Sequence, residues 1–144
     1  MAAKSKAVKS TMQCYPIRLH PGQEIRQCLL DFIKEHGLKA AFIITCVGSV
    51  TQARLRMASG QEIKDLKGPF EIVSLVGTLS GGEGGHLHIS LSDTEGNVIG
   101  GHVIGNLTVF TTAEVMIGEC EEAIFIRQDD AETGFDELVV QKRT

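Results

Sequence analysis

Three of the five histidines in the sequence lie close together, in its most glycine-dense part. His86 and His88 are two residues apart, and His102 follows a Gly-Gly pair a short way along the chain. Neutral imidazole is a common ligand of zinc and of other divalent transition metals, and three histidines that leave one coordination position open form a recognised Lewis-acid site. The chemistry that these residues would support is therefore metal binding, provided that the fold brings them together.

The segment that separates His88 from His102 predicts a β-hairpin. Residues 93–97 lie between two alternating apolar stretches, and Gly96 suits the left-handed position that closes a three-residue hairpin loop. In that register the apolar residues of both strands share one face, and His88 falls directly opposite His102, with His86 on the same side. A two-residue loop would instead place His102 on the other face, so the hydrophobic pattern favours the first register.

The elements that must position the hairpin follow from the hydrophobic periodicity. Apolar residues from Ile25 to Ile33 recur at helical spacing and Gly37 is a suitable C-terminal cap, which predicts one amphipathic helix between Gln23 and Gly37. Strands are predicted at residues 12–19, 40–47, 50–57, 70–79, 86–92, 98–104, 107–117, 123–127 and 138–141, with a break at Gly48-Ser49 and loops at residues 60–68, 80–85 and 128–137. Because no repeated βα unit appears, the predicted fold class is α+β: a mainly antiparallel, curled β-sheet with one principal α-helix packed on it.

Two charged residues are candidates for a ligand contact or for support of the histidines. Arg18 lies among apolar residues of the first strand; it either enters the site as an anion-binding or charge-balancing group, or faces solvent on an edge strand. Glu71 stands in a strand that is predicted to be buried, where a carboxylate needs a partner. An ion pair with Arg18 or Arg54 is favoured for Glu71 over a role as a general base beside a metal.

Composition and charge exclude several classes of function. The 144 residues suit a single domain, predicted at residues 12–142, after a disordered basic leader at residues 1–11. The net charge is −4 and three lysines lie in the leader, so the domain itself offers no basic surface to nucleic acid. No long uncharged apolar stretch or signal-peptide pattern is present, so no membrane partner is expected. None of the four cysteines is in a short-spaced pair, and with no secretory signal they are expected to be reduced thiols of an intracellular protein. A cytoplasmic location is expected rather than a nuclear one.

Several spaced motifs are specific in combination, although each one is common. They are Ile17-Arg18-Leu19, Gly68-Pro69-Phe70-Glu71-Ile72-Val73, His86-Leu87-His88, Asp93-x-x-Gly96, Gly100-Gly101-His102 and Thr112-Ala113-Glu114-Val115. Together they resemble the plants-and-prokaryotes-conserved (PPC) domain over residues 13–127. The resemblance implies an α+β fold, a homotrimer, and a bound metal at His86, His88 and His102, with zinc as the first candidate.

The resemblance does not extend to the DNA-binding part of the plant members. There the domain follows an AT-hook built around Arg-Gly-Arg-Pro, which this sequence lacks, and Pro69 stands where the plant domains have an arginine in a partner-binding segment. The leading hypothesis is therefore a small intracellular homotrimer that binds a metal through three histidines, together with a small anionic ligand. Whether it is an enzyme stays open, because no general base is fixed by the sequence. The alternatives are a DNA-associated or transcription-related module, and a metal-free assembly module whose histidines are polar groups of an interface.

Overall fold

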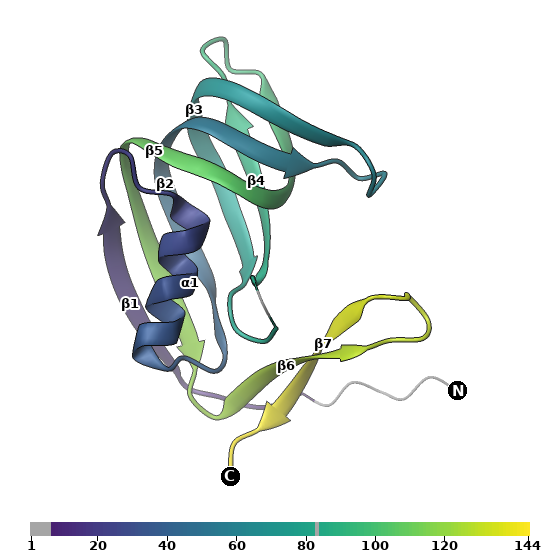
Figure 1. Cartoon of the computed structure of the whole chain (residues 1–144). Helices are drawn as coiled ribbons and strands as arrows, with labels where there is room; N and C mark the ends of the chain where they lie inside the picture. The colour runs from purple at the N-terminus through teal and green to yellow at the C-terminus, as the bar shows by residue number, and fades with distance from the viewer. Residues whose placement is uncertain (1–6, 83) are drawn as a thin grey trace.

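One helix and seven strands make up the described part of the chain, residues 7–82 and 84–144 of the computed structural model. The elements are β1 (Met12–Leu19), α1 (Ile25–His36), β2 (Ala41–Arg56), β3 (Ile63–Thr78), β4 (His86–Ser92), β5 (Val98–Cys120), β6 (Ala123–Asp129) and β7 (Asp136–Lys142) (Figure 1). All strand pairings are antiparallel. The predicted α+β class, with one helix and a curled antiparallel sheet, is confirmed.

The main sheet curls until its strands pair in a closed circuit. Its order is β1-β5-β2-β3-β4, and β4 also pairs with β5. The length of β5 makes this closure possible, because β5 pairs with β4 at its start and with β2 along most of its length, and its last part also pairs with β1. The enclosed core contains apolar side chains from every strand of the circuit, among them Leu55, Leu75, Leu91 and Val109.

The helix α1 covers one side of this sheet and packs mainly against β5 (Figure 1). Its buried side chains are Ile25, Leu29 and Ile33, which belong to the predicted apolar stripe. The Glu24 carboxylate caps the first turn by accepting hydrogen bonds from the backbone N–H groups of Arg26 and Gln27, and it also accepts one from Leu107 at 3.0 Å. One carboxylate thus fixes both the start of the helix and its position against β5. Among the described residues, no helix is long and apolar enough to cross a lipid bilayer.

Two predicted strand breaks and one predicted loop are wrong. The strand β2 continues through Gly48-Ser49, because Gly48 (φ 149°) bulges where the Thr112 carbonyl of β5 approaches too closely for any side chain. The gap predicted between residues 104 and 107 is a bend inside β5, at the positive φ of Asn106 (55°). The strand β3 begins at Ile63, inside the predicted loop 60–68, because pairing with β2 orders that polar stretch.

The C-terminal strands form a separate hairpin that projects from the main body (Figure 1). The two strands predicted at 123–127 and 138–141 are confirmed, and pairing extends to Asp129 and Asp136, so the connecting loop is shorter than predicted. At the other end of the chain, the first six residues of the predicted leader lie outside the described residues. Ser10 and Thr11, which follow them, hydrogen-bond to the carboxylate of Glu122.

Candidate metal centre

The hairpin β4–β5 has the predicted register. Its loop is closed by hydrogen bonds from Asp93 N–H to the Asn97 carbonyl (2.9 Å) and from Gly96 N–H to the Asp93 carbonyl (3.1 Å), with Gly96 at φ 86°. His88 pairs with His102 across the hairpin. The prediction that these two side chains share one face is therefore confirmed.

The three imidazole rings converge on one point. Each of His86, His88 and His102 offers a ring nitrogen, and these atoms all lie within 4.8 Å of one another. The ring centroids are 5.0 Å apart for His86 and His88, 5.5 Å for His86 and His102, and 5.6 Å for His88 and His102. A tetrahedral zinc with Zn–N bonds of about 2.0–2.1 Å needs ligand nitrogens about 3.3 Å apart, which small side-chain rotations would reach from this arrangement.

The ring nitrogens of this cluster have no hydrogen-bond partner among the residues that the structure describes. His36 shows the contrast, because its Nδ1 lies 3.0 Å from the Phe32 carbonyl oxygen at the end of α1. His86 and His88 are exposed and His102 is half-buried. Unpartnered imidazoles that face one another are suited to a ligand that none of their neighbours supplies.

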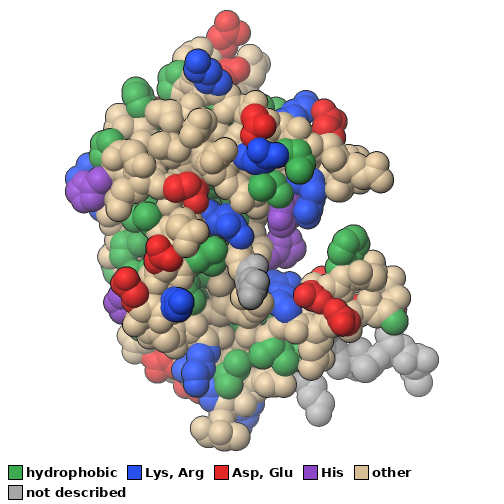
Figure 2. Space-filling view, in the orientation of Figure 1, with side chains coloured by type: hydrophobic (Ala, Val, Ile, Leu, Met, Phe, Trp, Pro, Cys, Tyr) green, Lys and Arg blue, Asp and Glu red, His purple; other side chains and the backbone are tan. Residues whose placement is uncertain are grey.

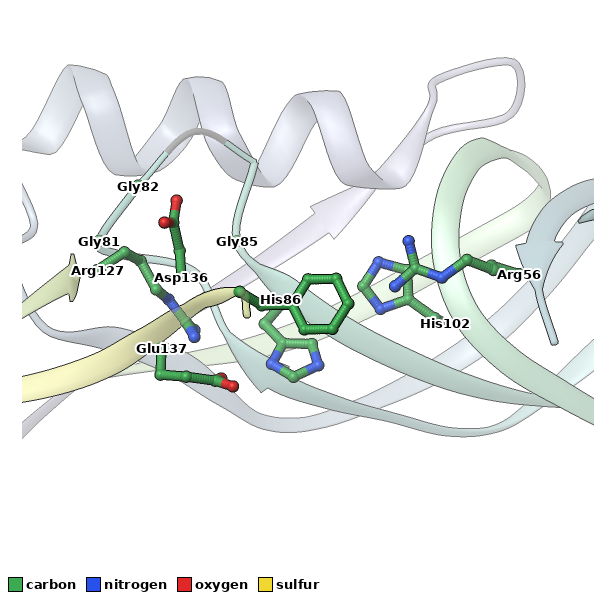
Figure 3. Close-up of a pocket in the computed structure, with 10 residues that line it drawn as sticks. Arg56, Gly81, Gly82, Gly85, His86, His102, Arg127, Asp136 and Glu137 are labelled. Atoms are coloured by element: carbon green, nitrogen blue, oxygen red, sulfur yellow. The ribbon is translucent and has the colours of Figure 1, made fainter. Parts of the chain in front are cut away.

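A row of paired residues across four strands fixes the orientation of two of the histidines. Arg56 of β2 pairs with His102 of β5, His102 pairs with His88 of β4, and His88 pairs with Val76 of β3. Paired residues in a sheet direct their side chains to the same face, about 5 Å apart. The row points outward because the residues next to it point into the core: Leu55, Val103, Ile89 and Leu75. The guanidinium of Arg56 is thereby placed beside the His102 ring, as Figure 3 shows.

A second arginine reaches the cluster from the C-terminal hairpin. Arg127 of β6 donates a hydrogen bond to Thr78 Oγ1 at 2.9 Å, and Thr78 pairs with His86. The two arginines therefore flank the histidines from different sides, one on the sheet and one on the hairpin.

The surroundings keep two of the imidazoles neutral. Partial burial, the Arg56 charge and the other two histidines lower the pKa of His102 to about 4. Burial, His88 and Arg127 also lower the pKa of His86. A histidine must be deprotonated to bind a metal, so both rings are in the ligating form at neutral pH.

Cavities open on two sides of the cluster. One of about 430 Å³ is lined by Arg56, Gly81, Gly82, Gly85, His86, His102, Arg127, Phe135, Asp136 and Glu137 (Figure 3). Another, of about 540 Å³, lies over the β4–β5 hairpin and is bordered by Met57, Ser90 and Gly100. In Figure 2 the histidine surface lies at the inner end of a cleft between the main body and the β6–β7 hairpin. The cluster is thus open to small molecules.

The structure places Arg18 away from the histidines. Its Nε donates a hydrogen bond to Thr112 Oγ1 at 3.0 Å, between β1 and β5. It does not line the described cavities around the cluster.

Glu71 also lies apart, on β3 seven residues from Thr78. It is exposed, because the alternation of the strand turns its neighbours Phe70 and Ile72 into the core, and the expectation that it is buried is wrong. Arg54, one of its expected partners, pairs with Asp65 at 3.6 Å instead.

The residues that sequence reasoning missed are the walls of the larger cleft: Arg56, Arg127, Phe135 and Glu137. A local signal existed only for Arg56, whose alternation with Leu55 marks it as outward-facing. Its pairing with His102 joins residues far apart in the chain, and the hairpin that carries the other three bears no periodicity that predicts where it lies.

The sequence matches the family model described as the Plants and Prokaryotes Conserved (PCC) domain over residues 6–121. A bifunctional protein GlmU of Synechococcus sp. (strain JA-3-3Ab) is 39% identical over 132 residues, which are 92% of this chain and 21% of that protein. The AT-hook motif nuclear-localized protein 8 of Arabidopsis thaliana is 30% identical over 110 residues, 71% of this chain and 28% of that protein. The chain thus spans between a fifth and a third of the length of these two relatives.

Two solved structures share the whole fold. A hypothetical protein from Salmonella has 42% sequence identity and a TM-score of 0.91, covering 95% of this chain and 99% of that one. A metal-containing protein from Archaeoglobus fulgidus has 25% identity and a TM-score of 0.79, covering 93% of this chain and 99% of that one. The alignments cover nearly all of both chains, whereas the family model ends before the β6–β7 hairpin.

Proposed function

The chain belongs to the Plants and Prokaryotes Conserved domain family, and from that premise we propose that it is a metal-binding member. The metal is a divalent transition ion, with zinc as the first candidate, and its ligands are His86, His88 and His102. Bound there, it would supply a Lewis acid to whatever ligand enters the cleft.

The observation that carries this proposal is the convergence of three imidazole nitrogens within 4.8 Å of one another. Two properties support it: the rings have no hydrogen-bond partner among the described residues, and the pKa values of His86 and His102 are lowered. The similar protein from Archaeoglobus fulgidus is described as metal-containing, which agrees with the proposal without identifying the ion.

Elemental analysis of protein purified without an affinity tag tests the proposal. We expect about one metal ion per chain in the wild type, and loss of that metal in His88→Ala. His36→Ala is the matched control, because His36 is bonded at the end of α1, and it should retain the metal. A wild-type protein that is fully stable, free of metal and unable to take up added zinc would end the proposal.

We further propose that the chain assembles as a homotrimer through an aliphatic patch on β2 and β3. The patch consists of Ile44, Val47, Val73 and Val76, which are 41–59% exposed. The register that pairs Phe42 with Thr78 and Ser49 with Glu71 places these side chains next to one another. Contiguous exposed aliphatic residues of this kind are typical of protein interfaces. Since Val76 pairs with His88, a neighbouring subunit on this patch would lie beside the metal centre.

Light scattering at micromolar concentration tests the assembly, with a trimer expected for the wild type. Val47→Lys should shift the protein towards monomers, because it buries a charge in the interface. Val98→Lys is the control, since Val98 has the same 59% exposure but lies at the loop end of the β4–β5 hairpin. A monomeric wild type would refute the trimer.

The remaining parts of the proposal are a small anionic ligand and an intracellular, cytoplasmic location. The arginines beside the histidines support the proposal of an anionic ligand.

The rival proposal is a DNA-associated module, suggested by relatives that are named for an AT-hook. The net charge of −4 and the absence of an Arg-Gly-Arg-Pro stretch speak against it. A mobility shift with duplex DNA at low salt would favour the rival.

A further inference from the structure

The two arginines at the cluster make no salt bridge in the described chain, although Asp136 and Glu137 of the hairpin line the same cavity. Arg56 and Arg127 form no ion pair with any residue that the structure places, whereas Arg54 and Arg143 do. Arg56 is held by its pairing with His102, and Arg127 by its hydrogen bond to Thr78 Oγ1. A guanidinium presents several donors in a fixed plane that matches a carboxylate or phosphate. Two such groups on opposite sides of the cluster are suited to an oxyanion between them.

The charges along the cavity determine when an oxyanion would bind. Arg56 and Arg127 bring two positive charges, and Asp136 and Glu137 on the hairpin bring two negative ones. The formal charges of these four lining side chains therefore balance. A divalent metal on the histidines would make the cavity positive, so attraction of an anion depends on the metal.

The hairpin adds an apolar surface to the same cavity. Phe135 lines it and is 73% exposed, the largest exposure among the large apolar side chains of the described chain. The cavity volume of about 430 Å³ is in the range that suits a small ligand. Phosphate alone would leave this ring uncovered, whereas an organic acid with an apolar body would cover it.

We propose that the cleft binds a small carboxylic acid with an apolar or aromatic body. Its carboxylate lies between Arg56 and Arg127 on the open side of the metal, and its body packs against Phe135. This inference rests on the proposed metal site and names the class of molecule that the site takes. It also assigns specificity to the β6–β7 hairpin, which lies beyond the part of the chain that the family model matches.

Titration of benzoate into the zinc-loaded protein, followed by amide NMR and calorimetry, tests the inference. Benzoate should bind at millimolar concentration or below, while neutral benzamide should not, and inorganic phosphate should bind more weakly than benzoate. Arg56→Gln and Arg127→Gln should each weaken benzoate at least about tenfold, the size expected for loss of a hydrogen bond to a charged group. Phe135→Ala should weaken benzoate about fivefold and leave phosphate unchanged.

Two controls separate this inference from the metal proposal. Arg54→Gln removes one arginine charge from β2, the strand that also carries Arg56. Because Arg54 is paired with Asp65 outside the cavity, benzoate binding should be unchanged. Zinc content and melting temperature are measured for every variant. Metal-free protein should bind benzoate at least about tenfold more weakly, because the cavity charge then balances.

The outcomes point to different failures. Three results would overturn the inference and leave the metal proposal standing. The zinc-loaded wild type does not bind benzoate, or it binds phosphate more tightly than benzoate, or the two arginine variants bind benzoate as well as the wild type. Wild type that takes up no zinc overturns the metal proposal. Benzoate binding that is equally strong without metal overturns the charge argument on which the inference depends.

Discussion

Two clusters of ionisable side chains in this protein have opposite relations to their surroundings. The first, which we term the C-terminal clamp, consists of Glu119, Arg143 and the backbone groups that they bond. Glu119 is 7% exposed and accepts hydrogen bonds from the N–H groups of Lys39 and Ala40, and Arg143 approaches the same carboxylate to 3.1 Å. Arg143 also donates to the carbonyl oxygens of Cys120 and Ala123. Every charge in the clamp is matched within the chain.

The histidine cluster has the reverse arrangement. Its three imidazoles meet without a partner among the described residues, and the arginines beside it have no counter-charge in contact. A buried charge that is fully hydrogen-bonded stabilises a particular fold, whereas polar groups that face one another without a partner are typical of ligand-binding sites. The difference indicates that the clamp holds the chain end in place, and it supports the proposal that the histidine cluster is the functional site.

The largest expected effect on the fold is at the clamp. Glu119→Ala should lower the free energy of unfolding by about 3 kcal/mol, because it leaves Arg143 and two backbone N–H groups without their acceptor. Urea denaturation measures the change. Asp65→Ala, which breaks the exposed pair with Arg54, should cost no more than about 0.5 kcal/mol. His88→Ala in metal-free protein should be similarly small, and an equal loss at His88 and Glu119 would erase the distinction between the clusters.

Metal removal should affect only the histidine cluster. A ligand at one hundred times its dissociation constant stabilises the folded state by about 2.7 kcal/mol, so chelation should lower the melting temperature of the zinc-loaded wild type measurably. The melting temperature of Glu119→Ala should fall by a similar further amount on chelation, and that of His88→Ala should not change. A chelator effect that persists in His88→Ala would place the metal elsewhere.

A smaller effect is expected at Glu24, another carboxylate that is fully bonded within the chain. Glu24→Ala removes the cap of α1 and the acceptor of the Leu107 N–H group, and should cost about 1–2 kcal/mol. The metal content should stay at the wild-type level. Glu35→Ala, on the exposed side of the same helix, is the control and should change the stability little. A loss of metal in Glu24→Ala would show that the clusters are coupled.

The smallest effect concerns Glu122, which bonds Ser10 and Thr11 ahead of β1. Hydrogen bonds from Ser10 and Thr11 hold the pKa of this carboxyl below its ordinary value of 4.5. Because the folded-state pKa is depressed, the anchor is fully present above that value and is lost as the pH falls through the lowered pKa. The Thr11 amide resonance should follow this loss, and Ser10→Ala should move it to higher pH. A Thr11 resonance that is insensitive to acid would contradict the anchor.

Local patterns were sufficient to predict the histidine hairpin. The loop glycine Gly96 and the alternation of apolar residues determine which side chains share a face, and both act within seventeen residues of sequence. The helix was predictable for the same reason, because Leu29 and its neighbours recur at a helical period. The fold class follows from these elements without long-range information.

Long-range pairing explains what the sequence could not predict. The strand β2 continues through Gly48 because β5 lies against it, and Arg56 enters the site because the same pairing sets it beside His102. The direction of the β6–β7 hairpin depends on contacts such as Arg127 with Thr78, which no local pattern encodes. Glu71 shows the converse error. Its strand is mostly apolar and was therefore expected to bury Glu71, but this side chain faces outward.

The most direct test of the metal centre is a crystal structure of the untagged protein, with diffraction data collected on both sides of the zinc absorption edge. The account predicts an anomalous peak about 2.0–2.1 Å from a ring nitrogen of each of His86, His88 and His102. Crystals grown with zinc that show no such peak, and in which the three rings bond only to water, would contradict it.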